Sequence, residues 1–261
     1  MKTGISTACL YPLETEKSLE LLLQLGFRLF EVFLNAEQEL APAFLKGLRE
    51  KAKEYGAEFV SVHPYTSSSE SLLLFGNYPR RTAEGFALYR RYLEAAAVLG
   101  AGYVVIHGQP QGHGKLSDAE YWERFGELSL LGEGLGVSPA QENVRQHRGS
   151  VPSFLQGMRE ALGSLCAFVL DVKQCVMSGF SIEDTARAMG NRLCHIHLSD
   201  HTAERPCLLP GEGDFDFEAF RSLLLELQYK GAVVTEVYRD NFSEPAELEK
   251  VLRYTKNVFN R

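Results

Sequence analysis

The chain has 261 residues, of which 45% are hydrophobic and 23% charged, and its formal net charge is −7. This composition is that of an ordinary globular protein and excludes a disordered, collagen-like or coiled-coil chain. An acidic surface repels phosphate backbones and anionic lipid, so we expect neither nucleic acid nor a membrane as a partner.

No stretch reaches the roughly 18 consecutive apolar residues of a membrane helix. The first residues also lack the continuous apolar core of a signal peptide. We therefore expect a cytoplasmic protein with reduced cysteines. Their spacing matches no zinc-binding pattern. The five cysteines are Cys9, Cys166, Cys175, Cys194 and Cys207.

Along the chain, an apolar-striped segment that ends in glycine recurs, and each time a β-rich run follows at once. Glycine just beyond a helix end adopts the left-handed conformation that a β-carbon disfavours, so each glycine predicts a helix end. The average spacing is near the roughly 30 residues of a βα unit. In chain order the glycines are Gly26, Gly56, Gly100, Gly136, Gly163, Gly190 and Gly231.

Helices are predicted before these glycines, and a last one after the final strand, from apolar spacing and from start signals. The apolar stripes and start signals are, in chain order, Leu19–Leu22–Leu23, Leu45–Leu48–Ala52, the capping box of Ser117 with Glu120, Asp216, and Pro245. The runs after the glycines are short and almost continuously apolar, which is typical of parallel strands buried on both faces.

A first strand at Gly4–Cys9 brings the count to eight strands, and eight helices alternate with them. Eight βα units in a chain of this length predict an α/β protein with a single (β/α)8 TIM barrel over residues 1–261. An open doubly wound sheet is the alternative, but no G-x-G-x-x-G follows the first strand. The longest irregular stretches, His63–Arg81, His107–Ser117 and Asp200–Asp214, are expected to be loops over the active site.

Polar residues end six consecutive strands, and in a barrel these ends converge on one face. One such residue alone is ordinary, but a cluster of carboxylates repels itself unless a cation or proton is shared. The strand-end residues are His63, His107, Glu142, Asp171, the pair His195 and His197, and Glu236. Glu31 lies in the middle of an earlier strand and is expected to face the barrel interior in a structural role.

A divalent metal ion resolves the repulsion among Glu142, Asp171 and Glu236. Three carboxylates suit Mg²⁺ or Mn²⁺, and one imidazole keeps Zn²⁺, Co²⁺ or Fe²⁺ open. His195 and His197 are two residues apart on a strand and therefore share a face. We expect His197, nearer the strand end, to be the fourth ligand and His195 to contact the substrate or the ligands.

These residues carry a resemblance to a known group of proteins. The chain resembles the xylose-isomerase-like barrels, the superfamily of sugar isomerases and epimerases and of apurinic endonucleases. The matching pieces occur in the right order along almost the whole chain. They are SVHP at Ser61–Pro64, VIHG at Val105–Gly108, ENV at Glu142–Val144, LD at Leu170–Asp171, HIHLSD at His195–Asp200, PGEGDFDF at Pro210–Phe217 and TEV at Thr235–Val237.

The epimerase branch of this superfamily implies one metal ion held at Glu142, Asp171, His197 and Glu236, with the two glutamates as acid and base on opposite faces of a sugar. Removing a proton next to a carbonyl creates an enediolate, whose charge a cation stabilises. One base takes the proton and a second group on the other face returns one, which inverts the carbon. The expected substrate is a small sugar or sugar phosphate, and the oligomeric state is left open.

The endonuclease branch implies further metal ions at positions that match His63 and His107. It also implies an Asp-x-His pair after the seventh strand, where this chain reads HTAERPCLLPGEG, and a histidine at Gln174. A multi-zinc hydrolase, or a metal- or sugar-binding or lyase-type barrel, is therefore the alternative to the isomerase.

Two cationic residues are candidate substrate contacts. Lys173 binds a phosphate or carboxylate, or else faces outward into solvent, because strand-end side chains alternate faces. Arg205 clamps a substrate oxygen or phosphate from the seventh loop, or is a solvated loop arginine. Gln174, which departs from the D-x-x-H of the epimerases, can still hydrogen-bond a hydroxyl but cannot ionise. His63, His107 and His195 complete the expected substrate-contacting set.

Overall fold

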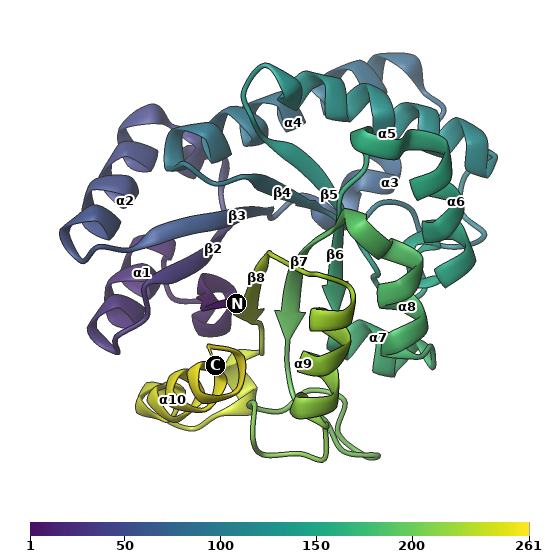
Figure 1. Cartoon of the computed structure of the whole chain (residues 1–261). Coiled ribbons are helices and arrows are strands. Elements are labelled where there is room, and N and C mark those ends of the chain that lie inside the picture. The colour runs from purple at the N-terminus through teal and green to yellow at the C-terminus, as the bar shows by residue number, and fades with distance from the viewer. Residues whose placement is uncertain (261) are drawn as a thin grey trace.

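A computed structural model describes residues 1–260 of the chain and confirms the predicted (β/α)8 barrel (Figure 1). The eight strands pair in parallel in chain order, and β1 also pairs with β8, from Lys2↔Ala232 to Ile5↔Thr235, which closes the barrel. The open doubly wound alternative is therefore wrong. The strands are β1 Lys2–Ser6, β2 Leu29–Leu34, β3 Glu58–Pro64, β4 Tyr103–Ile106, β5 Ser138–Glu142, β6 Phe168–Asp171, β7 Leu193–Leu198 and β8 Ala232–Thr235.

The helices form the outer layer around the strands (Figure 1). Two βα units contain an additional helix, so residues 1–260 hold ten α-helices where the sequence predicts eight. The extra helices are α3, after β3, and the second helix of the α7–α8 pair after β6. The helices are α1 Thr15–Gln24, α2 Pro42–Glu54, α3 Glu70–Leu73, α4 Pro79–Leu99, α5 Asp118–Glu133, α6 Pro152–Leu162, α7 Val172–Ser178, α8 Ile182–Met189, α9 Phe217–Glu226 and α10 Leu248–Phe259.

Several predicted boundaries move by a few residues. β1 ends at Ser6 rather than Cys9, because Thr7–Leu10 form a 3-10 turn in which the Thr7 hydroxyl accepts a hydrogen bond from the Phe33 amide. The predicted loop over residues 63–81 contains α3. Pro245 begins a 3-10 turn that leads into α10 at Leu248. The capping box of Ser117 and Glu120 at the start of α5 is confirmed.

Six of the seven predicted glycines have the positive φ that glycine permits, although ψ at Gly163 and Gly190, −113° and −136°, lies outside the left-handed helical region. Gly231 is the exception, and at the end of α9 Gln228 has the positive φ of 55° instead. Gly231 is required for a different reason, because a β-carbon there would lie 2.2 Å from the carbonyl oxygen of Cys194. The interpretation of Gly231 as a left-handed helix end is therefore wrong, although the strand that follows it is correctly placed.

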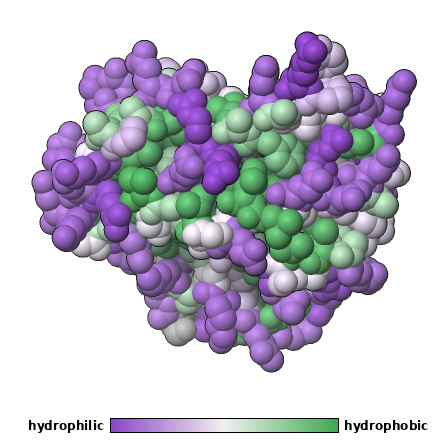
Figure 2. Space-filling model, turned by 90° about the horizontal axis from the view of Figure 1, so that it is seen from above, coloured by the Kyte–Doolittle hydropathy of each residue, from purple (hydrophilic) through white to green (hydrophobic). Residues whose placement is uncertain are grey.

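The core lies between the strands and the helical layer, where aromatic side chains such as Tyr89, Tyr121 and Phe125 are fully buried. Hydrophilic side chains dominate the outline of the molecule, with apolar patches among them (Figure 2). None of the helices in residues 1–260 is long and apolar enough to cross a membrane. The five cysteines are free thiols, as predicted.

Candidate metal centre and active site

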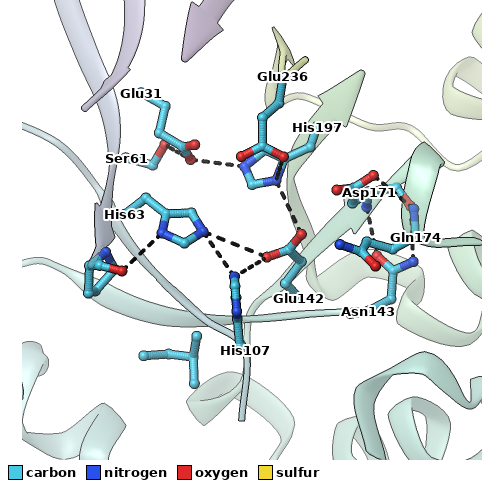
Figure 3. A network of polar contacts seen from close by, with 12 residues as sticks. Glu31, Ser61, His63, His107, Glu142, Asn143, Asp171, Gln174, His197 and Glu236 are labelled. Carbon is cyan, nitrogen blue, oxygen red and sulfur yellow. Dashed lines mark hydrogen bonds and ion pairs between the residues drawn. The ribbon is translucent and has the colours of Figure 1, made fainter. Parts of the chain in front are cut away.

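The polar strand ends meet at the mouth of the barrel, as the sequence predicts. β5 ends in Glu142, β6 ends in Asp171, β7 carries His197 and the residue after β8 is Glu236. One ligand atom from each of these four residues lies within 4.8 Å of the others. Figure 3 shows Glu142, His197 and Glu236 pointing toward one another across the barrel.

The donor atoms of this cluster suit a divalent cation. His197 Nδ1 lies 3.5 Å from Glu142 Oε1 and 3.4 Å from Glu236 Oε2. Within residues 1–260, Nδ1 of His197 and Oδ2 of Asp171 are buried and have no hydrogen-bond partner. Buried polar atoms normally have hydrogen-bond partners. In this part of the chain His197 Nδ1 has none beside two carboxylates, and the ionic partner of Asp171 Oδ2 is the Lys173 ammonium at 3.4 Å, so the cluster is suited to a cation. Three carboxylates and one imidazole form a donor set for Mg²⁺, Mn²⁺, Co²⁺ or Zn²⁺.

Asp171 is oriented by the elements on both sides of it. It caps the N-terminus of α7, where its Oδ1 accepts a hydrogen bond from the Gln174 amide at 3.1 Å. The side chain of Asn143, which follows β5, bridges the backbone N–H and C=O of Asp171 at 2.7 and 3.0 Å. Burial, with Glu142 and Glu236 nearby, raises the pKa of Asp171 to about 7 despite the Lys173 ammonium.

Glu31 orients His197 from inside the barrel. Its Oε2 lies 2.9 Å from His197 Nε2 and 3.2 Å from His195 Nε2, and it accepts a hydrogen bond from the Ser61 hydroxyl at 2.8 Å. Burial alone raises the pKa of Glu31, but His197 and His195 outweigh it and hold that pKa well below its usual range. Because a carboxylate accepts only, Nε2 of His197 carries a proton toward Glu31, and Nδ1 faces the cation site. Burial lowers the pKa of His197, but Glu236 and Glu31 outweigh it and raise that pKa well above its usual value, so a metal ion at Nδ1 would replace a proton there.

His195 does not reach the cavity. It is fully buried beside Ser61 and Glu31, and it is not among the residues that line the cavity. Its predicted role as a substrate contact is therefore not supported, and it contributes to the same hydrogen-bond network as His197. Glu31 faces the barrel interior, as the sequence predicts.

A second group of donors shares Glu142. His107 Nε2 lies 3.1 Å from Glu142 Oε2 and 3.0 Å from His63 Nε2, and His63 Nδ1 lies 3.3 Å from the Pro64 carbonyl oxygen. Burial raises the pKa of Glu142, but His107 and His197 outweigh it and keep that pKa well below its usual range. The ring of Phe33 stacks on His63 with a centroid distance of 4.6 Å. Both histidines line the cavity, as expected.

Lys173 points inward toward carboxylates, and the alternative that it faces outward into solvent is wrong. It is 3% exposed, and its Nζ lies 3.4 Å from Asp171 Oδ2 and 3.2 Å from Glu236 Oε2. The same ammonium lies 4.6 Å from the centre of the Tyr238 ring. Gln174 lines the cavity too, but its side-chain carbonyl accepts a hydrogen bond from the Arg145 amide at 2.9 Å.

The cavity above these groups has a volume of about 490 Å³. Tyr11, Tyr65 and Tyr238 are exposed at its rim. Lys173 is the only lysine or arginine among its lining residues within the described part of the chain. Arg205 is exposed and lies outside this lining, so the structure does not place it at the site.

Sequence reasoning missed Glu70, Asn143 and Tyr238. Glu70 is a fully buried carboxylate of α3 that accepts hydrogen bonds from the Tyr89 hydroxyl and, at 2.5 Å, from the Gly108 amide. No sequence pattern distinguishes it from an exposed loop glutamate. Asn143 directly follows Glu142, and Tyr238 follows the strand-end Glu236 by two residues. Their closeness in sequence to the predicted ligands Glu142 and Glu236 is the feature from which Asn143 and Tyr238 could have been predicted.

A sequence model described as the xylose isomerase-like TIM barrel matches residues 19–258 of the chain. An uncharacterized protein of Mycobacterium leprae is 25% identical over 277 residues, covering 97% of this chain and 94% of that protein. An uncharacterized protein of Methanocaldococcus jannaschii is 22% identical and covers 100% and 91%.

Solved structures with the same fold include sugar epimerases. A D-psicose 3-epimerase crystallised in the presence of D-fructose superposes with a TM-score of 0.82 at 18% identity, over 100% of both chains. The 3-keto-D-glucoside 4-epimerase of E. coli superposes with a TM-score of 0.78 at 17% identity, over 98% of this chain and 99% of that one. At these identities the likeness establishes the fold alone, and the chemistry has to be argued from the residues of the site.

Proposed function

This chain belongs to the xylose isomerase-like TIM barrel family, and on that basis we propose that it is a metal-dependent isomerase or epimerase of a small sugar. The observation that carries the proposal is that Glu142, Asp171, His197 and Glu236 converge on one point beneath a cavity, where Nδ1 of His197 has no hydrogen-bond partner among the described residues. The sugar epimerases among the structural neighbours agree with this reading.

The four converging side chains would hold one divalent ion, and when bound the ion supplies stabilisation of negative charge that develops on substrate oxygens. Glu142 and Glu236 move the protons. Burial raises the pKa of Glu236, but His197 and Lys173 outweigh it and lower that pKa below its usual value, as the histidines do for Glu142. Both groups are therefore carboxylates able to take a proton from carbon, and each lies within reach of the same small space.

The charge of the cavity favours an unphosphorylated substrate. A phosphate carries about −1.5 to −2 charges and is normally met by several cationic or amide donors. Here the one lining ammonium, Lys173, already faces Asp171 and Glu236. The exposed tyrosines at the rim offer flat apolar faces and hydroxyl groups, which suit a neutral polyol.

Solvent exchange tests the proposal. We expect the metal-loaded protein to incorporate deuterium from D₂O at the carbon next to the carbonyl of a ketose, in a panel of free and phosphorylated ketoses followed by NMR. Glu142→Gln or Glu236→Gln should lower the exchange rate by roughly 10²–10⁴-fold, since each removes an acid–base group. Asp171→Asn should act mainly by weakening metal binding. Glu58→Gln, an exposed carboxylate paired with Lys2, is the control and should exchange normally.

One observation favours the alternative of a hydrolase with several metal ions. His63, His107 and Glu142 form a second group whose donor atoms lie within 4.8 Å of one another. The metal content therefore discriminates, with one ion per chain expected for the isomerase and two or three for the hydrolase. A protein that exchanges no carbon-bound proton across the panel, yet cleaves a phosphoester, would establish the hydrolase in place of the isomerase.

A further inference from the structure

We propose that Lys173 is a built-in counter-ion of the metal site, which holds Asp171 and Glu236 in the metal-free protein and competes with the metal ion for them. The inference rests on the proposed metal dependence and deepens it. It concerns how tightly this chain holds its metal ion.

The position of Lys173 follows from the fold. It lies in the first turn of α7, two residues after Asp171, and both residues are buried. Asp171 is itself tied to the helix N-terminus and to Asn143, so the backbone brings the lysine stem to the strand ends. The ammonium then lies between an oxygen of Asp171 and an oxygen of Glu236, at 3.4 and 3.2 Å.

These two distances are longer than the 2.7–2.9 Å of a strong bond between an ammonium and a carboxylate. The ammonium therefore donates one long hydrogen bond, to Glu236, and faces Asp171 without one. Oδ2 of Asp171 has no hydrogen-bond partner in the described chain. On the other side the ammonium meets the face of the Tyr238 ring at 4.6 Å, an attractive contact that does not use an acceptor atom.

The charges around the site explain why a cation is needed there before any metal arrives. Glu31, Glu142, Asp171 and Glu236 bring four carboxylates into the barrel mouth, all of them buried or nearly so. Buried charges without a partner are costly, and like charges this close repel. Lys173 is the one lysine or arginine of the described residues that lines this cavity, so it is the permanent positive charge available to two of the carboxylates.

A metal ion and this ammonium require the same oxygen atoms. A cation bound to Asp171 and Glu236 would lie close to Nζ in a partly desolvated site, where two positive charges repel strongly. The metal must therefore displace the ammonium from its acceptors. The flexible four-carbon stem of lysine permits this displacement. Lys173 therefore stabilises the metal-free protein and weakens the binding of the metal ion.

Manganese binding to the metal-free protein tests this inference. Protein stripped with EDTA and dialysed is titrated with MnCl₂, and free Mn²⁺ is followed by electron paramagnetic resonance. We expect Lys173→Met to bind Mn²⁺ at least about tenfold more tightly than the wild type. Metal-free Lys173→Met should also unfold at a lower temperature than the metal-free wild type, and saturating Mn²⁺ should reduce that difference.

Two further variants complete the experiment. Lys173→Gln removes the charge with a polar side chain and should also tighten Mn²⁺ binding, which keeps the test valid if the methionine variant does not fold. Lys230→Met is the matched control, because it removes one positive charge from an exposed position just before β8, at the opposite end of the barrel. It should leave both measurements unchanged.

The outcomes separate this inference from the proposed function. Equal or weaker Mn²⁺ binding by both Lys173 variants, with the wild type binding normally, overturns the counter-ion role and leaves the metal-dependent isomerase in place. If wild type and variants alike bind no Mn²⁺, Co²⁺, Zn²⁺ or Mg²⁺, the metal site fails and the counter-ion role fails with it.

Discussion

At the scale of single residues, the site depends on groups that do not face the substrate. Glu31 accepts from the Nε2 atoms of two histidines, and through His197 it determines which ring nitrogen faces the carboxylates. Carboxylates that orient a metal-binding histidine in this way are a recurrent feature of metal sites. Glu31 therefore acts on the cation through His197, from a position where it is fully buried.

Replacing Glu31 with glutamine should weaken metal binding with little change in shape. The amide is neutral, and it presents one acceptor oxygen and one donor group to two histidines that each need an acceptor. Loss of such an orienting partner typically costs about 10–100-fold in metal affinity. Titration with Mn²⁺ measures the effect, and Glu58→Gln serves as the exposed control. Unchanged affinity would mean that Glu31 only fills space beneath the site.

At the scale of elements, the connection from β3 to α4 depends on a close approach between two helices. The chain leaves β3 at Pro64, forms the short helix α3, and turns into the long helix α4 at Pro79. Gly85 of α4 permits this turn, because a β-carbon there would lie 2.1 Å from the carbonyl oxygen of Leu73 in α3. A glycine at this position is therefore required by the close approach of two helices, although glycine usually disfavours a helix interior.

The pair Gly85→Ala and Gly47→Ala tests that explanation. Gly47 lies within α2, and a β-carbon there would have no neighbour within 4 Å. We expect Gly47→Ala to raise the free energy of unfolding by about 0.5–1 kcal/mol, since alanine favours the helix. Gly85→Ala should lower it by about 1–3 kcal/mol, because the extra methyl group overpacks the α3–α4 contact. Urea denaturation of both variants measures these opposite signs, and two stabilising substitutions would refute the packing role of Gly85.

At the scale of the whole molecule, the barrel brings together strands that are far apart in sequence, as in the pairing of Lys2 in β1 with Ala232 in β8. Glu31 of β2 meets His197 of β7, and Glu236 after β8 lies beside Glu142 of β5. Closure of β8 onto β1 makes this convergence a property of the complete barrel. The connections after the strands add further buried polar contacts, such as that of Glu70 with Gly108 and Tyr89.

Glu70 should make the stability of the whole molecule fall as the pH rises. Burial is the main cause that raises its pKa from 4.5 to about 7, so the folded protein binds a proton that the unfolded chain has released. The stability that this group contributes is complete below pH 4.5 and is lost as the pH rises through 7. A shift of this size corresponds to roughly 3 kcal/mol.

Comparison with Glu70→Gln isolates this contribution from the other titrating groups. The free energies of unfolding of both proteins are measured in urea from pH 4.5 to pH 8. Over this range the wild type should lose roughly 3 kcal/mol of stability relative to the Glu70→Gln variant. A difference between the two proteins that stays constant across this range would show that Glu70 does not titrate as a buried carboxyl group.

The sequence by itself determined the barrel and the strands that carry the site. A glycine after each apolar helix reports local backbone geometry, and short apolar runs report burial on both faces, so neither signal needs knowledge of distant residues. The polar residues Glu142, Asp171, His197 and Glu236 stand out for the same reason, since each interrupts or directly follows an apolar run. Even here a local signal failed at Gly231, where a close approach to Cys194 rather than backbone conformation requires the glycine.

Only the tertiary structure decided where individual side chains point. The sequence favours His197 over His195 as a ligand because His197 is nearer the strand end. Only the structure shows that His195 is enclosed with Ser61 and Glu31, while His197 presents Nδ1 to the carboxylates. The inward direction of Lys173 depends on α7 starting at Val172, and the burial of Glu70 depends on its contacts with Gly108 after β4 and with Tyr89 of α4. These outcomes are set by partners far away in the chain, and a hydrogen bond or ion pair between distant residues leaves no periodic trace in the sequence.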